Sequence, residues 1–136
     1  MPIPVTLNPP ELALVRVVNR ERAAHGLAAL RPVRGLTRVA RIHSLDQMRH
    51  GTIGHGSSDG TSFRQRLARI GRFSIAGEVV AWTGGHGHAT ATRIVRMWMS
   101  SPPHRAELLN PRFRTLGVGR ARGRRGTWVT ADLAGR

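Results

Sequence analysis

The stretch WMSSPPHRAELLNPRFRTLGVG, residues 98–119, places His104 directly behind two prolines and then passes from a helical pattern into an extended one. Each proline fixes its φ angle at about −65°, so the backbone that carries this histidine is stiff. Residues 104–110 predict a short helix, and residues 113–121 predict a strand. We expect the core beneath the histidine to be closed by four apolar side chains: Trp98, Leu108, Leu109 and Phe113.

The rest of the chain predicts helices on either side of one extended run, followed by a hairpin. The expected elements are helices from Asn8 to Gly26, from Leu36 to Gly51 and over residues 63–71, a strand over 73–82, a helix over 90–100, and a strand over 126–135 that pairs with 113–121. This order favours the α+β class over alternating βαβ units. A chain of 136 residues is typical of one domain, residues 1–136.

The composition is strongly basic and contains no cysteine. Lysine and arginine together number 22 against 7 acidic residues, which gives a net charge of +15, and every basic residue is arginine. We interpret the use of arginine in place of lysine partly as coding bias, but the charge still attracts nucleic acid, acidic lipid or an anionic cell wall. The absence of cysteine excludes thiol catalysis, disulfides and thiolate metal sites.

The sequence contains no membrane-spanning pattern and no recognisable leader. No apolar run reaches the length of about 18 residues that a spanning helix needs. The first ten residues, MPIPVTLNPP, lack the basic and apolar regions of a signal peptide. We therefore expect either a cytoplasmic protein or one whose leader is absent from this sequence.

Three polar residues are candidates for a functional site. His55 lies in the loop GHGSSDG, where a single histidine is more often simply solvated. Glu78 lies in the apolar stretch GEVVA, where a carboxylate is costly unless paired, and one of the many arginines could pair with it. His104 lies at a predicted helix start, whose dipole favours the neutral imidazole that a metal or a general base requires. Its alternative role is to close the helix turn.

Other basic groups have simpler interpretations. His86 and His88, in a glycine-rich loop, would bind transition metals adventitiously rather than as a dedicated site. The hairpin turn carries a basic ribbon that could meet phosphates, but no nucleic-acid-binding motif accompanies it and aromatic residues are only 4%. This ribbon consists of Arg120, Arg122, Arg124 and Arg125. The arginines of the third helix region are interpreted as a solvated face: Arg64, Arg66, Arg69 and Arg72.

Six segments, taken in order, resemble the CAP superfamily of cysteine-rich secretory, antigen 5 and pathogenesis-related proteins, and most closely its bacterial, cysteine-free SCP-like branch. GHGSSDG resembles the family's H-x-S-P-D-G loop, GEVVA its G-E-N-I-A strand, and residues 98–119 its W-x-x-S-P-x-H-R segment that ends in G-V-G. The other three are VVNRERAAHGLAAL (17–30), ARIHSLDQM (40–48) and WVTADLAG (128–135). The resemblance covers nearly the whole chain.

This resemblance implies a three-layer α-β-α sandwich around a central, mainly antiparallel sheet. It also implies that His55, Glu78 and His104 line one cleft, since these positions match the family's cavity residues. In some members that cleft binds Zn²⁺ or another divalent ion, and two imidazoles with one carboxylate would leave a position for water. No organic cofactor is expected.

Three functions are open on these grounds. The first is a secreted or cell-envelope binding module that presents the cleft and a basic surface to an anionic cell-wall polymer, a lipid or a protein. The second is a metal-assisted hydrolase that uses the same cleft. The sequence favours binding, because it shows no nucleophile beside a base and no second cleft carboxylate. The third is a cytoplasmic protein that binds nucleic acid non-specifically through its charge.

Overall fold

The fold is a four-stranded sheet with helices on both faces, and the computed structural model describes residues 5–84 and 89–135. His86 and His88 lie outside the described residues. The elements in chain order are α1 (Pro9–Ala24), β1 (Arg31–Pro32), α2 (Arg34–His50), α3 (Phe63–Ala68), β2 (Ile75–Thr83), α4 (Ala91–Met99), α5 (Pro102–Leu108), β3 (Phe113–Gly123) and β4 (Gly126–Gly135).

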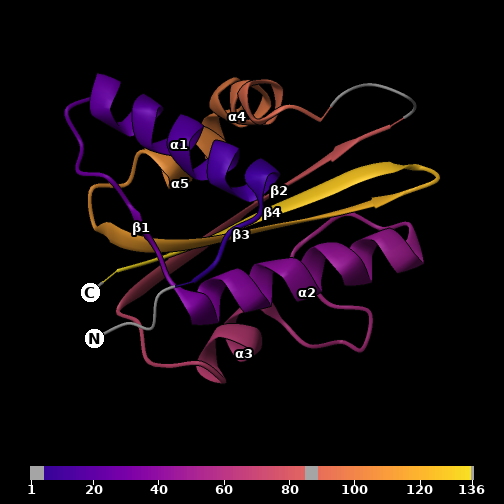
Figure 1. Cartoon of the computed structure of the whole chain (residues 1–136). Helices are drawn as coiled ribbons and strands as arrows, with labels where there is room; N and C mark the ends of the chain where they lie inside the picture. Colours follow the sequence, from indigo (N-terminus) through magenta and orange to yellow (C-terminus); the bar gives the residue numbers. More distant parts are fainter. Residues whose placement is uncertain (1–4, 85–88, 136) are drawn as a thin grey trace.

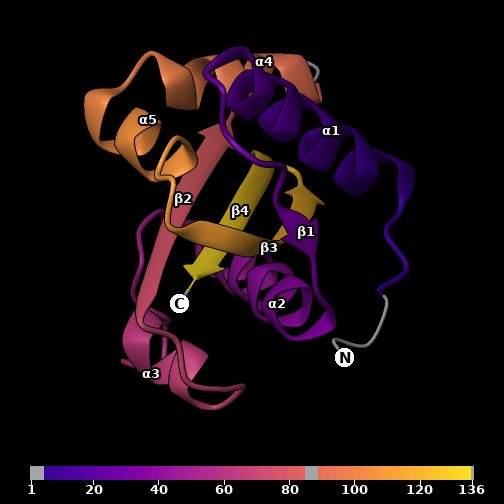
Figure 2. The ribbon, with the colours of Figure 1, turned by 90° about the vertical axis from the view of Figure 1, so that its left-hand side faces the viewer.

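The strands lie in the order β1-β3-β4-β2. The β3–β4 and β4–β2 pairs are antiparallel, while the two-residue β1 runs parallel to β3. Figure 1 shows α1, α4 and α5 on one face of the sheet and α2 and α3 on the other, and Figure 2 shows the same layers from the side. The α+β class and the three-layer sandwich expected from the sequence are therefore confirmed. Within the described ranges, no helix is both long and apolar enough to cross a membrane.

Helix α2 lies unusually close to β3, and two glycines of the quoted stretch explain why. A Cβ atom on Gly117 would stand 2.0 Å from the backbone of Leu36 and Thr37, and one on Gly119 would stand 2.3 Å from the backbone nitrogen of Arg41. No side chain fits these gaps. The glycines therefore let the backbone of α2 rest directly on the sheet, and this fixes the position of the α2 side chains that enter the site.

Buried Arg22 ties α1 to the end of α5. Its Nε donates to the carbonyl of Ala28 at 2.8 Å, and its Nη1 donates to the carbonyls of Leu108 and Asn110, both at 2.9 Å. Leu108 is the last residue of α5, while Ala28 and Asn110 follow the ends of α1 and α5, so these carbonyls have no helical partner. The guanidinium thus supplies the hydrogen bonds that hold the segment carrying His104 against α1.

The main core fills the space between the sheet and the layer of α1, α4 and α5. Trp98, Leu108 and Phe113 are each 1% exposed, as expected. The expectation for Leu109 is wrong, because it is the half-buried C-cap residue of α5. Successive helical residues point about 100° apart. Leu108 and Leu109 therefore cannot both face the core, and it is Leu108 that does.

Candidate functional site

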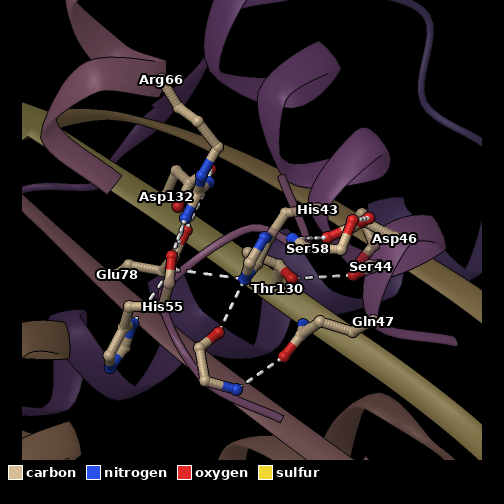
Figure 3. A network of polar contacts seen from close by, with 12 residues as sticks. His43, Ser44, Asp46, Gln47, His55, Ser58, Arg66, Glu78, Thr130 and Asp132 are labelled. Carbon is tan, nitrogen blue, oxygen red and sulfur yellow. Dashed lines mark hydrogen bonds and ion pairs between the residues drawn. The ribbon is translucent and has the colours of Figure 1, made fainter. Parts of the chain in front are cut away.

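The site is centred on the carboxylate of Glu78, which lies inside the molecule between the sheet and α3. The Glu78 side chain is 1% exposed and extends from the middle of β2. Arg66 of α3 forms a two-pronged ion pair with it, from Nη1 to Oε2 and from Nη2 to Oε1, both at 3.0 Å. Figure 3 shows Arg66, Asp132 and His55 around this carboxylate. The pairing of Glu78 with an arginine, one of the two sequence interpretations, is what the structure shows.

Arg66 is buried, which corrects the interpretation of the α3 arginines as a solvated face. It is 7% exposed, whereas Arg64, Arg69 and Arg72 are exposed. A capping box at Ser62 starts the helix, and Arg66 and Leu67 then form its inward side. An unpaired carboxylate inside the protein is costly, so the guanidinium that pairs with Glu78 is drawn into the interior with it.

His55 contacts Glu78 from the opposite side. Its Nδ1 donates to Oε1 of Glu78 at 2.9 Å, while 55% of the His55 side chain stays exposed. Arg66 Nη2 also donates to the backbone carbonyl of His55 at 2.6 Å. The hydrogen bond to Glu78 raises the pKa of His55. The imidazole is thus attached to the buried pair at one edge and open to solvent at the other.

Two buried side chains of α2 fix the loop that carries His55. Gln47 accepts a hydrogen bond from the backbone nitrogen of Gly54 at 2.8 Å, and Nε2 of His43 donates to the carbonyl of Gly54 at 2.7 Å. Both backbone groups of the residue before His55 are therefore held. Burial lowers the pKa of His43, so this imidazole is neutral. Sequence reasoning missed both residues, although they lie in the ARIHSLDQM segment.

A second contact stabilises the far side of the same loop. The backbone nitrogen and the hydroxyl of Ser58 both donate to the carboxylate of Asp46, at 2.8 Å and 2.5 Å. A proline at position 58 has no backbone N–H and could not make the first of these bonds. Serine at this position therefore holds the loop through hydrogen bonds rather than through a fixed φ angle.

His104 is close enough to His55 for the charge of His55 to affect it, but it forms no hydrogen bond with His55 or Glu78 in the described part of the chain. It is half-buried in the first turn of α5. Burial, followed by the positive charge of His55, lowers the pKa of His104. This direction favours the neutral imidazole that the sequence predicts for His104. The structure therefore brings His55 and Glu78 into contact and leaves His104 as a neighbour of that pair.

Glu107, on α5, is a second carboxyl near the site. Its Oε2 is buried without a hydrogen-bond partner among the described residues and lies over Gly77, where a Cβ atom would come within 1.7 Å of it. Burial raises the pKa of Glu107, and the nearby charge of His55 lowers it less. Gly77, the glycine of GEVVA, thus leaves the space that the Glu107 carboxyl occupies.

Asp132 is a third carboxyl, and it faces Glu78 across the β2–β4 ladder. It is 0% exposed. Burial, followed by the hydrogen bond and the negative charge of Glu78, raises the pKa of Asp132 well above 3.8, which favours its protonated form. Burial alone would raise the pKa of Glu78, but hydrogen bonds from Asp132, His55 and Arg66 outweigh it and lower that pKa to about 2. Asp132 is thus a buried carboxyl beside Glu78 that the sequence analysis did not identify.

Replacing Asp132 with asparagine should flatten the pH dependence of stability. The pKa of Asp132 in the folded protein lies above its unfolded value of 3.8. Its contribution to the free energy of unfolding is therefore complete below pH 3.8 and is lost as pH rises through the folded pKa. Glu78 has the opposite pH dependence, because its pKa is lowered from 4.5 to about 2. Its contribution to the free energy of unfolding is complete above pH 4.5 and is lost as pH falls towards 2. Above about pH 5, the contribution of Asp132 to the unfolding free energy should therefore fall by about 1.4 kcal/mol per pH unit while the folded group stays protonated.

Urea unfolding at a series of pH values from 5 upward measures this difference. The Asp132→Asn chain keeps the size of the side chain but takes up no proton when it folds. Because the histidines are common to both chains, the unfolding free energy of the variant minus that of the wild type should rise by about 1.4 kcal/mol per pH unit over this range. Parallel pH profiles for the two chains would show that Asp132 is ionised in the folded protein.

Comparison with known proteins places this arrangement in a family. The model of the CAP family, the cysteine-rich secretory protein family, matches residues 15–133. The chain belongs to the CAP family. This match includes the α2 residues, the His55 loop, β2, α5 and β4, and so every element of the site.

Two proteins of Bacillus subtilis are among the relatives. The YkwD protein of Bacillus subtilis is 32% identical over 117 residues, which are 85% of this chain and 44% of YkwD. The membrane protein YlbC of the same organism is 34% identical over 111 residues, or 80% of this chain and 31% of YlbC. The chain therefore spans less than half the length of these two relatives.

Two solved bacterial structures share the fold. An extracellular protein of Bacillus anthracis that contains an SCP domain superposes with a TM-score of 0.81 at 25% identity, covering 98% of this chain and 45% of that one. An outer surface protein of Borrelia burgdorferi also gives 0.81, at 21% identity, and the match covers 100% of both chains. The second likeness shows the fold alone.

The residues as arranged do not fit the divalent cation that the resemblance implies. Arg66 occupies both oxygens of Glu78, and His55 approaches one of them. A metal ion at this carboxylate would have to displace a buried guanidinium of the same sign of charge. Across residues 5–84 and 89–135, no group of three or more histidine and carboxylate side chains is placed to hold a metal ion. Zinc binding itself stays a prediction without a test.

Proposed function

We propose that this CAP domain is a binding module of the cell envelope or cell exterior, and that its cleft is a rigid support rather than a catalytic centre. The main observation behind the proposal is that both carboxylate oxygens of Glu78 already accept hydrogen bonds. A general base needs a free lone pair and a pKa near the working pH. Glu78 receives hydrogen bonds on both oxygens, and its pKa is lowered to about 2.

In this proposal Arg66 supplies the positive charge that a divalent cation supplies in other members. The guanidinium is permanently charged and matches a carboxylate in two places, so it neutralises Glu78 without any exchangeable ion. It also bonds to the carbonyl of His55. The loop, α3 and β2 are thereby joined by groups that the chain itself carries.

The location outside the cytoplasm is proposed from the family and its neighbours. The Bacillus anthracis protein is described as extracellular and the Borrelia protein as an outer surface protein. The cytoplasmic alternative has no comparable support among these neighbours. The activity and partners of any longer protein that carries this domain are likewise proposals.

The binding surface of the module is proposed to be its basic exterior. Three of the seven acidic residues, Glu11, Glu78 and Asp132, are buried, so the exterior is more basic than the net charge of +15 indicates. Only two of the described arginines, Arg22 and Arg66, are buried. A surface of this kind attracts anionic polymers over a long range and without sequence preference.

A hydrolase remains the second candidate because of two residues on α5. The pKa of His104 is lowered and that of Glu107 is raised, so the two could act as a base and an acid near His55. The exposed edge of His55 would then face the substrate. This candidate differs from the first by requiring turnover.

Binding to an anionic and a neutral polysaccharide separates these functions. Polygalacturonate should bind at about 50 mM salt and be released steeply towards about 200 mM, whereas dextran should not bind at either concentration. The length of the recovered polygalacturonate should be unchanged. Retention that does not respond to salt would contradict the binding proposal, and shortened chains would favour the hydrolase.

A further inference from the structure

A small basic pocket lies at the end of the molecule formed by the last turn of α2 and the β3–β4 turn. Its volume is about 240 Å³, and its lining includes Arg49, His50, Arg124, Arg125 and Trp128. Figure 1 shows the end of α2 and this turn at the same end of the sheet. Pockets for drug-sized ligands usually measure about 300–1,000 Å³, so this one suits a single small group.

The arginines of this pocket have no partners within the described chain. The guanidinium groups of Arg49, Arg124 and Arg125 take part in no hydrogen bond or ion pair among residues 5–84 and 89–135. Asp46 is near this end, but its carboxylate is engaged by Ser58 and lies 3.4 Å from His50. Several like charges held at one turn repel each other unless an anion neutralises them.

The backbone leaves room for these side chains. At Gly51, which ends α2 with φ at +63°, a Cβ atom would come within 3.1 Å of Nη1 of Arg125. Gly51 therefore has two roles: it adopts the left-handed conformation that ends α2, and it leaves space for the guanidinium of Arg125. Trp128 donates from Nε1 to the carbonyl of Thr52 at 2.9 Å, which fixes the aromatic wall of the pocket.

An exposed aromatic ring adjoins the pocket. Trp82 is 44% exposed, and its ring centroid lies 6.2 Å from that of Trp128. Its Nε1 donates to the carbonyl of Arg125 at 3.2 Å, so the ring is attached to the basic turn. A flat apolar surface beside an anion pocket suits a ligand that carries an apolar face next to its charge.

We infer that the hairpin-end pocket, defined by Arg49, His50, Arg124, Arg125 and Trp128, binds the phosphate groups of a polymer whose phosphodiesters link sugars or polyols. This inference rests on the proposed function, because it locates and names the anionic partner. Phosphate presents acceptor oxygens in three dimensions to several arginines, whereas one arginine already matches both oxygens of a planar carboxylate. Trp82 then contacts the sugar or polyol beside the phosphate.

Nucleic acid is also a phosphodiester polymer, but the surface suits it less well. Binding of single strands relies on several aromatic side chains that stack with successive bases. Trp82 is the one exposed aromatic ring established at this end of the described chain.

The test compares two doubly substituted chains of equal charge. Arg124→Gln/Arg125→Gln removes two pocket arginines, and Arg69→Gln/Arg72→Gln removes two exposed arginines next to α3. The probe is poly(glycerol phosphate) of defined length, with polygalacturonate of matched charge and duplex DNA as comparisons. The pocket substitutions should weaken poly(glycerol phosphate) binding about tenfold and reduce the salt slope by about 1.4, or about 0.7 per lost contact. The control pair should change affinity by less than about threefold.

Each of the other possible results would contradict one part of the inference. Equal weakening by both pairs would overturn the pocket and leave a general basic surface, so the proposed function would stand. Tighter binding of polygalacturonate than of poly(glycerol phosphate) would overturn the phosphate assignment. Tighter binding of DNA would overturn the polymer class. No binding of any polyanion would overturn the anionic partner of the proposed function as well.

Discussion

Replacing Arg66 with methionine should lower the free energy of unfolding by about 3–5 kcal/mol at neutral pH, because it leaves a buried charge without its partner. Glu78 would keep its hydrogen bond from His55 but lose both bonds from the guanidinium. Methionine fills a similar volume without charge. The loop at His55 would also lose the bond to its carbonyl. Chemical denaturation at neutral pH measures this loss.

Two companion measurements show whether the loss comes from the charge. Arg64→Met, at an exposed position of the same helix, should change stability by less than about 0.5 kcal/mol. In Arg66→Met, burial should raise the pKa of Glu78, so the deficit against the wild type should shrink as pH falls towards 4.5. The double variant Arg66→Met/Glu78→Gln should recover part of the loss. A deficit of under about 1 kcal/mol at every pH would show that the pair is not buried in solution.

Replacing Gly117 with alanine should cost about 3 kcal/mol, at the upper end of the usual range for overpacking. The added Cβ would stand 2.0 Å from the backbone of α2, and a backbone does not move aside as a flexible side chain does. Displacing α2 would also shift His43 and Gln47, which hold Gly54. We therefore expect weaker protection of the Gly54 amide in hydrogen exchange, together with lower stability.

Gly56→Ala is the matched control for this substitution. Gly56 lies in the His55 loop, has no atom within 4 Å of an added Cβ, and does not have a left-handed backbone. Alanine at this position should leave stability within about 0.5 kcal/mol of the wild type. If Gly117→Ala is equally neutral, the close approach of α2 to β3 in this structure is wrong.

The sequence predicts the architecture because local signals agree with the global fold. The capping boxes at Asn8 and Ser62 start helices where the patterns place them. The alternation in residues 113–121 and 126–135 gives two strands that pair as a hairpin. The two-residue β1 was missed, because a strand this short carries no periodicity. Leu109 was misplaced because two adjacent leucines give no phase.

The site could be predicted only in part, because its partners depend on distances across the sheet. The resemblance named His55 and Glu78, and the structure places them in contact. Asp132 carries the same signal as Glu78, a carboxylate in an apolar strand, and this rule could have identified it. Arg66 carries no such signal, because in sequence it resembles its exposed neighbours. Only the packing of α3 on β2 distinguishes it.

Calorimetric titration with Zn²⁺ tests most directly the claim that Arg66 takes the place of a metal ion in this cleft. All chains should carry His86→Ala/His88→Ala, which removes the glycine-loop histidines, and should be measured at about pH 8, where imidazoles are neutral. We expect no stoichiometric zinc site in the His86→Ala/His88→Ala chain. Adding His55→Ala or His104→Ala to that chain should therefore not change the titration. One bound equivalent of zinc that is lost with either histidine would contradict this expectation.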